Sequence, residues 1–422
     1  MPDRSSFLRR WLSAAILTLI AAAGLQTSPQ LIAGDWPQIL GPHRNGEADN
    51  EKLADTWPAD GPKTLWQRPV GRGYAGLAVV GQTGILFHRV ENEERVESID
   101  AATGKEGWHF AVPTSYVSGI SPDDGPRCVP VIHGDKVIVF GVQGTLACLR
   151  LSDGRKEWSH DTHAEFRASE GYFGAGSSPI VEGDKVIVNV GGLKTGAGVV
   201  AFALDTGKVL WKVGHDDASY SSPIAVTVGK TRYLIVETRL TIYSLDPENG
   251  KIRFQTPFGE RGPTVNGANP TVIGDHLFLT ASYGVGALFG RIHDASLETL
   301  WASDDILSTQ YATCIADRGL LYGVNGRDDV GRASLRLIDP AKQKIVWQKE
   351  DFGYATLLKA DGKILAQKTD GTLVLFRCDP ERYIELASAQ VFTVKTFALP
   401  ALSGGRLYVR DDHTLKCLDV HR

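Results

Sequence analysis

The sequence predicts an all-β protein folded as an eight-bladed β-propeller of four-stranded antiparallel blades. The first observation is a motif that leads from an apolar run through a polar turn to an aromatic residue, most clearly at Val96–Trp108. Its aromatic positions, 66, 108, 158, 211, 254, 301 and 347, are 42 to 53 residues apart, and periods of roughly 40–50 residues are typical of propeller blades. The second observation is that an eighth copy is split between Gly61–Trp66 and Leu415–Asp419. A repeat divided in this way predicts a ring closed by pairing of N-terminal and C-terminal strands.

Each unit is expected to contain two strand pairs in a fixed order. The inner pair is a polar turn followed by a β-branched or aromatic run, as in Gly134–Val139 and Gly183–Val188, which is a hairpin signal. Looser copies of this hairpin begin at Gln82, Thr231, Gly274, Arg318, Asp361 and Gly404. The outer pair is the aromatic motif, at Val96–Trp108, Leu146–Trp158, Val199–Trp211, Ile242–Phe254, Phe289–Trp301, Leu335–Trp347 and, weakly, Leu375–Leu386. The 46 glycines, and the lack of a sustained helical period after the N-terminus, agree with an all-β fold.

The residues of the outer motif have separate structural tasks. An aspartate such as Asp100 accepts hydrogen bonds from backbone N–H groups two residues on and shapes the turn. A glycine such as Gly104 supplies a positive φ at no steric cost. The tryptophans are expected to pack between neighbouring sheets, as core rather than as ligand platforms.

The chain is expected to divide into three segments. Residues 1–33 are predicted to be a signal peptide of uncertain cleavage point, because Arg4, Arg9 and Arg10 precede a short apolar stretch at Trp11–Leu25. A retained N-terminal anchor helix is the alternative. Residues 34–61 are expected to be an extension that packs on the propeller, and 62–422 are the propeller itself. We therefore expect an exported protein of the periplasm or cell envelope, soluble after signal cleavage and without a transmembrane span in the mature chain.

Charge and cysteine content bear on other classes of protein. The net charge is −4 and no basic stripe is present, which argues against nucleic acid as a partner. Among the five cysteines there is no Cys-x-x-Cys pair, so buried free thiols are expected. His160 and His163 lack a third ligand, which argues against a metal site. We expect a monomer.

The repeat Asp-x-x-Thr-Gly-Lys-x-x-Trp, seen at Asp100–Trp108, resembles the pyrroloquinoline-quinone-like (PQQ-like) eight-bladed propeller superfamily over about residues 62–422. The leader Trp36–Gly46 is similar to the opening of exported bacterial members. The resemblance implies one of two roles. The quinoprotein alcohol and sugar dehydrogenases bind the quinone and Ca²⁺ and carry a vicinal Cys-Cys, which this chain lacks. The propeller lipoprotein of the outer-membrane β-barrel assembly machinery is a non-catalytic scaffold, but this chain has no cysteine near its N-terminus to carry a lipid.

Candidate binding residues are expected where the repeat is interrupted. In a four-stranded blade the Asp-to-Gly turn lies on one face, and the connections to the next inner strand lie on the other, which we call the loop face. These connections are longest in blades 2 and 3, at 111–127 and 159–176. We expect a protein or carbohydrate ligand there, centred on Arg127 and Tyr172. The candidates at the channel mouth are Arg127, Glu170, Tyr172, Tyr220, Asn266, Asn269, Gln310, Tyr311, Tyr354 and Lys395.

These residues favour binding over catalysis. Several tyrosines, one arginine and amides suit a sugar or a peptide segment. The alternative is that these side chains only fill the narrow end of the ring. No catalytic residue is predicted, and no cofactor is expected. The alternative is a quinone-dependent oxidoreductase with an atypical site, which would bind PQQ and Ca²⁺.

Overall fold

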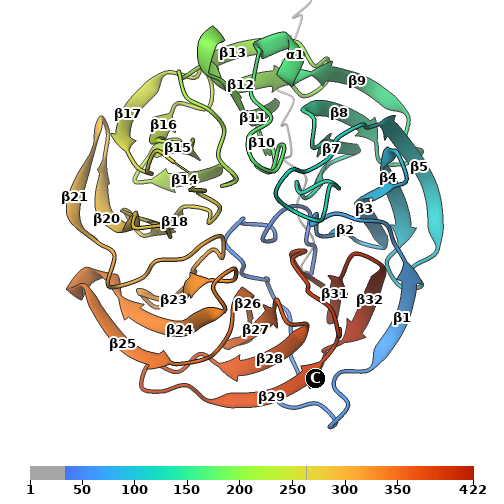
Figure 1. Ribbon diagram of the computed structural model, residues 1–422, viewed down its shortest axis with the longest axis vertical. Coiled ribbons are helices and arrows are strands. Elements are labelled where there is room, and N and C mark those ends of the chain that lie inside the picture. Colours follow the sequence, from blue (N-terminus) through green and yellow to red (C-terminus); the bar gives the residue numbers. More distant parts are fainter. Residues whose placement is uncertain (1–33, 263) are drawn as a thin grey trace, which may run out of the picture. The chain divides into compact units, whose positions relative to one another are not determined.

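The computed structural model describes residues 34–262 and 264–422, and these form a ring of eight four-stranded antiparallel sheets (Figure 1). The predicted all-β, eight-bladed propeller is therefore confirmed. In the described residues the helical elements are α1 (Thr162–Phe166) and the short 3₁₀ turns η1 (Leu193–Thr195) and η2 (Pro340–Lys342). The predicted signal peptide, 1–33, lies outside the described residues.

Within each of blades 1 to 7, the four strands follow one another outward in chain order. The first four blades are β2 (Ala78–Val80), β3 (Thr83–Val90), β4 (Glu93–Asp100) and β5 (Glu106–Pro113); β6 (Val131–His133), β7 (Lys136–Phe140), β8 (Thr145–Arg150) and β9 (Lys156–Asp161); β10 (Ile180–Glu182), β11 (Lys185–Gly192), β12 (Ala197–Ala203) and β13 (Val209–Val213); and β14 (Ile224–Val228), β15 (Thr231–Glu237), β16 (Thr241–Leu245) and β17 (Ile252–Pro257). The next three are β18 (Thr271–Ile273), β19 (His276–Ala281), β20 (Gly286–His293) and β21 (Ser296–Ser303); β22 (Ile315–Asp317), β23 (Leu320–Arg327), β24 (Arg332–Asp339) and β25 (Lys344–Lys349); and β26 (Ala355–Ala360), β27 (Lys363–Lys368), β28 (Thr372–Arg377) and β29 (Glu385–Gln390).

Blade 8 closes the ring with strands from both ends of the chain. Its inner three strands are β30 (Ala401–Ser403), β31 (Arg406–Arg410) and β32 (Thr414–Asp419), and its outer strand is β1 (Thr64–Pro69). β1 pairs antiparallel with β32, with Trp66 opposite Cys417 and Pro69 opposite Thr414. The predicted closure by Leu65–Trp66 on the C-terminal strand is confirmed, and it leaves no blade with an open sheet at the seam.

Six of the outer strands carry a tryptophan that docks on the next blade. Each indole N–H donates to a backbone carbonyl in the outer turn of that blade, at 2.7–3.3 Å, from Trp66, Trp108, Trp158, Trp211, Trp301 and Trp347. The turn glycine lies under the ring. At Gly207, where φ is +70°, a Cβ would lie 2.7 Å from the Trp158 ring, so this position needs glycine both for its φ and for its size. The tryptophans thus pack between blades as predicted, and most of them stay half-buried at the rim.

The other tasks predicted for the repeat are also seen. The Asp100 carboxylate accepts the backbone N–H groups of Ala102 (3.1 Å) and Thr103 (2.8 Å). Apolar clusters fill the spaces between adjacent blades, as where Ile138 and Val188 meet between blades 2 and 3. All five cysteines are free thiols, and four of them are buried. Within the described residues, no helix is long and apolar enough to cross a membrane.

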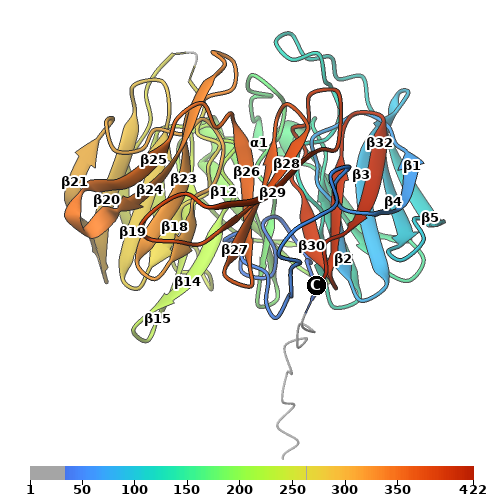
Figure 2. The same cartoon turned by 90° about the horizontal axis from the view of Figure 1, so that it is seen from below.

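The segment before β1 crosses the face that carries the Asp-to-Gly turns, which we call the base face; it is the blue segment near the lower face in Figure 2. We call residues 34–54 the strap. Its backbone pairs with Val79 of β2, with Lys359 of β26 and with Val420 beyond β32. Inner strands of blades far apart in the sequence are therefore bridged by one short segment.

Candidate functional site

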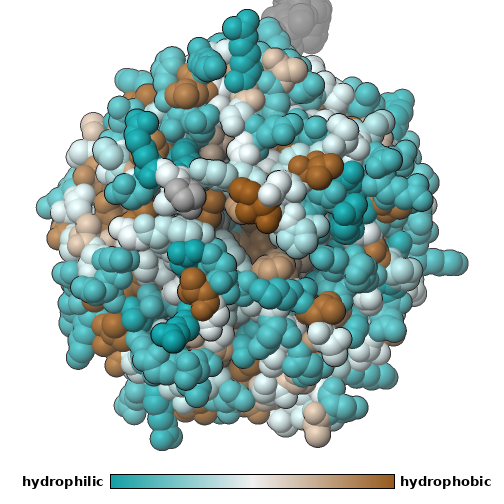
Figure 3. Space-filling view, viewed as in Figure 1, coloured by the Kyte–Doolittle hydropathy of each residue, from teal (hydrophilic) through white to brown (hydrophobic). Residues whose placement is uncertain are grey.

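The loop face is hollowed at the centre of the ring (Figure 3). Apolar side chains are scattered around this hollow among polar ones. Large apolar side chains that are exposed in the loops of this face are Val117, Ile120, Tyr172, Leu193, Val330 and Val394. They come from connections in several blades, so the loop face carries separate exposed apolar side chains surrounded by polar ones.

Eight equivalent positions, one per blade, line the entrance to the inner strands. In seven blades this position lies four residues before the first residue of the inner strand. In blade 7 the inner strand begins earlier, and the position is counted from Leu358, which pairs with Leu365 as Ala78 pairs with Ile85 in blade 1. We call these positions the mouth ring: Tyr74, Arg127, Gly176, Tyr220, Gly267, Tyr311, Tyr354 and Phe397. Four of the predicted candidates, Arg127, Tyr220, Tyr311 and Tyr354, belong to it.

Neighbours in the mouth ring touch one another. The ring centroids of Tyr74 and Phe397 are 5.0 Å apart, and those of Tyr311 and Tyr354 are 4.5 Å apart. The two glycines make room for the next residue round, since a Cβ on Gly176 would lie 2.5 Å from Tyr220 and one on Gly267 would lie 2.8 Å from Tyr311. The mouth ring is therefore a packed layer and not a set of independent side chains.

Arg127 is held by its own loop. Its guanidinium donates to the carbonyls of Gly125 (2.6 Å) and Asp123 (2.9 Å), and it lies over the rings of Tyr74 (5.2 Å) and Phe173 (6.0 Å). The side chain is nearly buried. Arg127 thus braces the connection from β5 to β6, with its donors already committed to backbone carbonyls.

Tyr172 and Tyr220 meet across blades 3 and 4. The Tyr220 hydroxyl accepts the backbone N–H groups of Tyr172 (3.0 Å) and Phe173 (2.8 Å), and burial raises the pKa of this hydroxyl to about 12. The Tyr172 hydroxyl donates to the carbonyl of Gly262 at 3.1 Å, while its ring stays exposed. Glu170, also exposed, lies in the same connection. Of these candidates, Tyr172 and Glu170 are the ones a partner can reach.

Asn266 and Asn269 are structural. Asn269 is part of a chain of bonds from blade to blade, in which its side-chain oxygen accepts the N–H of Ser222 (2.8 Å) and its own N–H donates to Thr313 (2.9 Å). The same pattern links Val129 to Ser178 and Ser178 to Ser222. Asn266, fully buried, donates its amide to the carbonyl of Arg239 at 3.2 Å.

The remaining candidates lie over blades 6 to 8. The buried Tyr354 hydroxyl accepts the N–H groups of Tyr311 (2.6 Å) and Ala312 (2.9 Å). Gln310 donates to the Tyr283 hydroxyl at 2.7 Å. Lys395 is exposed, pairs with Asp328 at 3.1 Å, and lies over the ring of Phe397.

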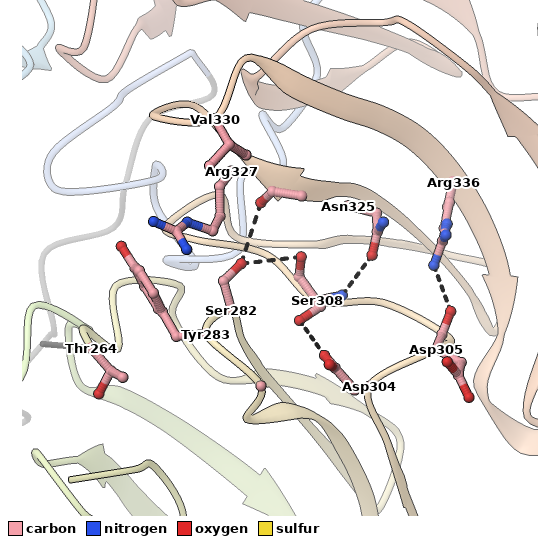
Figure 4. A pocket seen from close by; sticks show the side chains of 12 residues that line it. Thr264, Ser282, Tyr283, Asp304, Asp305, Ser308, Asn325, Arg327, Val330 and Arg336 are labelled. Carbon is pink, nitrogen blue, oxygen red and sulfur yellow. Dashed lines mark hydrogen bonds between the residues drawn. The ribbon is translucent and has the colours of Figure 1, made fainter. Parts of the chain in front are cut away.

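A depression on the loop face lies over blades 5 and 6, away from the predicted centre at blades 2 and 3 (Figure 4). It has a volume of about 770 Å³. Tyr283 stands at one end in a left-handed conformation, with φ of +66°, and the Arg327 guanidinium lies 4.2 Å from the centre of its ring. At the other end the Arg336 guanidinium donates to the carbonyl of Asp305 at 2.6 Å. A bulky residue at positive φ is strained, so the surroundings fix Tyr283 in place.

Sequence reasoning missed several of these residues. Tyr74 and Phe397 complete the mouth ring, and Tyr283 and Arg327 border the depression. A signal for the first two was present, because positions 74, 127, 176, 220, 267, 311, 354 and 397 recur at 43 to 53 residues, as the aromatic motif does. His160 lies in β9, where its ring bonds the Glu165 carboxylate at 2.9 Å and not a second histidine.

The family profile described as outer membrane protein assembly factor BamB matches residues 58–349, which is more than half of the chain. The chain belongs to this family. The match begins just before β1 and ends with β25, and so covers the closing strand and blades 1 to 6. The PQQ-like propeller superfamily indicated by the repeat is thus confirmed.

This BamB-family chain is similar to proteins from both branches of the superfamily, the dehydrogenases and the assembly factors. Quinohemoprotein alcohol dehydrogenase ADH IIB of Pseudomonas putida is 34% identical over 397 residues, 88% of this chain and 52% of that protein, so the chain spans about half of this relative's length. Outer membrane protein assembly factor BamB of Burkholderia pseudomallei (strain K96243) is 21% identical over 305 residues, 61% of this chain and 73% of that protein. The structure of BamB from Moraxella catarrhalis has a TM-score of 0.61 at 14% identity, covering 84% of this chain and 96% of that one, a likeness of fold alone.

Within 34–262 and 264–422, no three His, Cys, Asp or Glu residues are grouped so as to hold a metal ion. The carboxyl of Glu237, at the end of β15, is buried, and burial raises its pKa well above the usual range.

Proposed function

We propose that this chain is an exported, monomeric, non-catalytic scaffold of the BamB family, which holds an extended segment of a partner protein against its loop face. The observation that carries the proposal is the set of exposed apolar side chains around a packed mouth ring. Val117 is 77% exposed, Ile120 61% and Val330 57%. These side chains stand on loops that a rigid scaffold positions, and binding residues are concentrated on such loops.

Tyr172 is the anchor that we propose within the predicted centre at blades 2 and 3. Its ring is exposed, while its backbone is fixed by Tyr220 and its hydroxyl by Gly262. A rigid, half-exposed tyrosine contributes apolar area at little cost in conformational entropy. Arg127 is a positioning residue here, because its donors hold the connection that carries Val117 and Ile120.

The partner class follows from the names of the BamB relatives, which are assembly factors for outer membrane proteins. We propose a protein of that assembly process as the partner, recognised through an extended stretch with apolar side chains. A carbohydrate chain is the other outcome.

A photo-crosslinking amino acid placed at position 172 in the full chain tests this. Illumination of cells should give an adduct with another protein at position 172. The same amino acid at Lys105, which is exposed on the base face, is the matched control and should give none. Equal yields of adduct at both positions would contradict a binding site on the loop face. An adduct with a glycan and not with a protein would show that the ligand is a carbohydrate.

A quinone-dependent oxidoreductase is the second candidate, and the observation that favours it is the 34% identity to a quinohemoprotein alcohol dehydrogenase. Purified protein mixed with PQQ and Ca²⁺ tests it directly. A scaffold leaves the absorbance of the quinone unchanged and reduces no dye with alcohols or aldoses. A shifted quinone spectrum that persists after gel filtration, together with dye reduction, would establish the dehydrogenase instead.

A further inference from the structure

The proposed function makes no use of the leader motif Trp36–Gly46, yet most residues of this motif are buried. Trp36 is 1% exposed, and its backbone exchanges two hydrogen bonds of 2.8 Å with Val79 of blade 1. The carbonyl of Pro37 accepts the N–H of Ile132 of blade 2 at 2.8 Å. The first end of the strap is thus fixed to two blades by backbone pairing.

Arg44 joins the middle of the strap to blades 3 and 4. Its guanidinium donates to the carbonyls of Pro223 (2.7 Å), Pro179 (2.9 Å) and Ser178 (3.0 Å), and to the side chain of Gln38 at 3.0 Å. The side chain is 3% exposed, and burial lowers its pKa to about 9. None of the ion pairs within 34–262 and 264–422 involves it. A buried cation without an anion is tolerated only when its hydrogen bonds are made, and here carbonyl dipoles make them.

The far end of the strap is tied to blades 7 and 8. The carbonyl of Gly46 accepts the N–H of Lys359 at 2.8 Å, and the N–H of Ala48 donates back to Lys359 at 2.9 Å. The carboxylate of Glu51 accepts the N–H groups of Gly404 (2.6 Å) and Gly405 (2.7 Å). Hydrogen bonds therefore connect the strap to blades 1, 2, 3, 4, 7 and 8.

We infer that the strap is a clasp: it holds the inner strands together at the base face, independently of the seam between β1 and β32. We call Arg44 its keystone, because this side chain attaches the strap to blades 3 and 4. Each inner strand of a propeller is paired on one side and leaves its other edge toward the axis. The strap occupies three such edges, on β2, β6 and β26, by backbone bonds. Within 34–262 and 264–422, Arg44 makes the hydrogen bonds from the strap to blades 3 and 4, so loss of this side chain is expected to release the strap from them.

Native-state hydrogen exchange of the full chain, read by mass spectrometry, tests the clasp without any partner. The reporters are the amides of Val79, Ala48 and Lys359, which the strap pairing protects. Arg44→Met keeps the apolar volume but leaves three buried carbonyls without donors, so exchange at these amides should rise by about tenfold or more. Exchange in the hairpin of β8 and β9, which the strap does not touch, should not change. His43→Gln is the matched control, since His43 is the exposed neighbour and should leave all four regions as they are.

Arg44→Lys covers the case in which Arg44→Met does not fold. A lysine keeps the charge but loses the planar fork, so it should give the same selective increase at a smaller scale. Unchanged protection of the strap amides in Arg44→Met or Arg44→Lys overturns the keystone role. A uniform rise across all blades also overturns it, because it would mean that the arginine supports the whole ring and not the strap. Neither result depends on whether the proposed partner exists.

Discussion

The indole N–H of Trp66 donates a hydrogen bond of 3.1 Å to the carbonyl of Ala101, and this bond ties the strand that closes the ring to the first blade. Arg68, two residues later, adds an ion pair of 2.7 Å with the buried carboxylate of Glu97. Two kinds of contact therefore stabilise the seam between the ends of the chain. β1 pairs with β32 within blade 8, and side chains of β1 bind to blade 1. A ring depends on its seam, because opening it exposes a blade face and a strand edge together.

Removal of residues 414–422 should abolish cooperative unfolding. The deletion takes away β32, so that β1 has no partner and blade 8 keeps only two strands. Thermal unfolding followed by circular dichroism, with light scattering, should show a broad transition or aggregation. Deletion of Arg422 alone, which is exposed, is the control and should melt like the parent. A sharp transition in the longer deletion at the parent's temperature would mean that the seam is not where the ring is secured.

Gly207→Ala should destabilise the protein by about 1–3 kcal/mol, through overpacking against Trp158 and through strain at positive φ. Its matched control lies in the same blade. Gly183 has φ of +60°, but a Cβ there meets nothing within 4 Å, so Gly183→Ala should lose only the smaller, backbone part. Urea unfolding of both variants measures the difference. Equal losses in the free energy of unfolding of the two variants would show that packing against Trp158 does not contribute to the requirement for glycine at position 207.

Glu94→Gln should stabilise the protein above pH 7. Glu94 is 2% exposed, and burial raises the pKa of its carboxyl to about 7 from its ordinary value of 4.5. The folded state therefore holds a proton that the unfolded state releases, so stability falls as pH rises between these values. A glutamine still accepts the N–H of Val142 but never ionises. The gain should be about 2–3 kcal/mol at pH 8 and near zero at pH 4.5.

Melting temperatures across this pH range check the Glu94 prediction. Glu260→Gln, at an exposed position, serves as the control and should leave the pH profile unchanged. A stabilisation by Glu94→Gln that is the same at pH 4.5 and pH 8 would show that titration of this carboxyl is not the cause.

Tyr172→Ala and Arg127→Ala should separate binding from folding. Tyr172→Ala should weaken partner capture by roughly 1–4 kcal/mol, the range for interface anchors, with stability little changed. Arg127→Ala leaves the carbonyls of Gly125 and Asp123 without their donors, so it should reduce stability by about 1–3 kcal/mol. Melting temperatures measure the loss of stability. The yield of an adduct from a photo-crosslinking amino acid at Val117 measures partner capture, because position 172 is itself substituted. If Arg127→Ala keeps full stability and loses the partner, then the guanidinium faces the ligand after all.

The sequence by itself determined the ring, its eight units and its seam. These follow from turn residues and strand patterns that repeat within each unit, as at Asp100 and Gly104. Such local patterns predict turns and strands without any knowledge of tertiary contacts. The split of one unit between Trp66 and Leu418 gave the closure for the same reason.

What each side chain faces was decided only by the tertiary structure. Arg127 is committed to its own loop because Tyr74 and Phe173, from two other blades, close over it. Arg44 becomes a keystone because carbonyls from residues 178, 179 and 223 converge on it, more than a hundred positions along the chain. Tyr283 and Arg327 meet because blades 5 and 6 are adjacent. Such contacts depend on which blades the ring sets side by side and on the volume left between them, and a local repeat encodes neither.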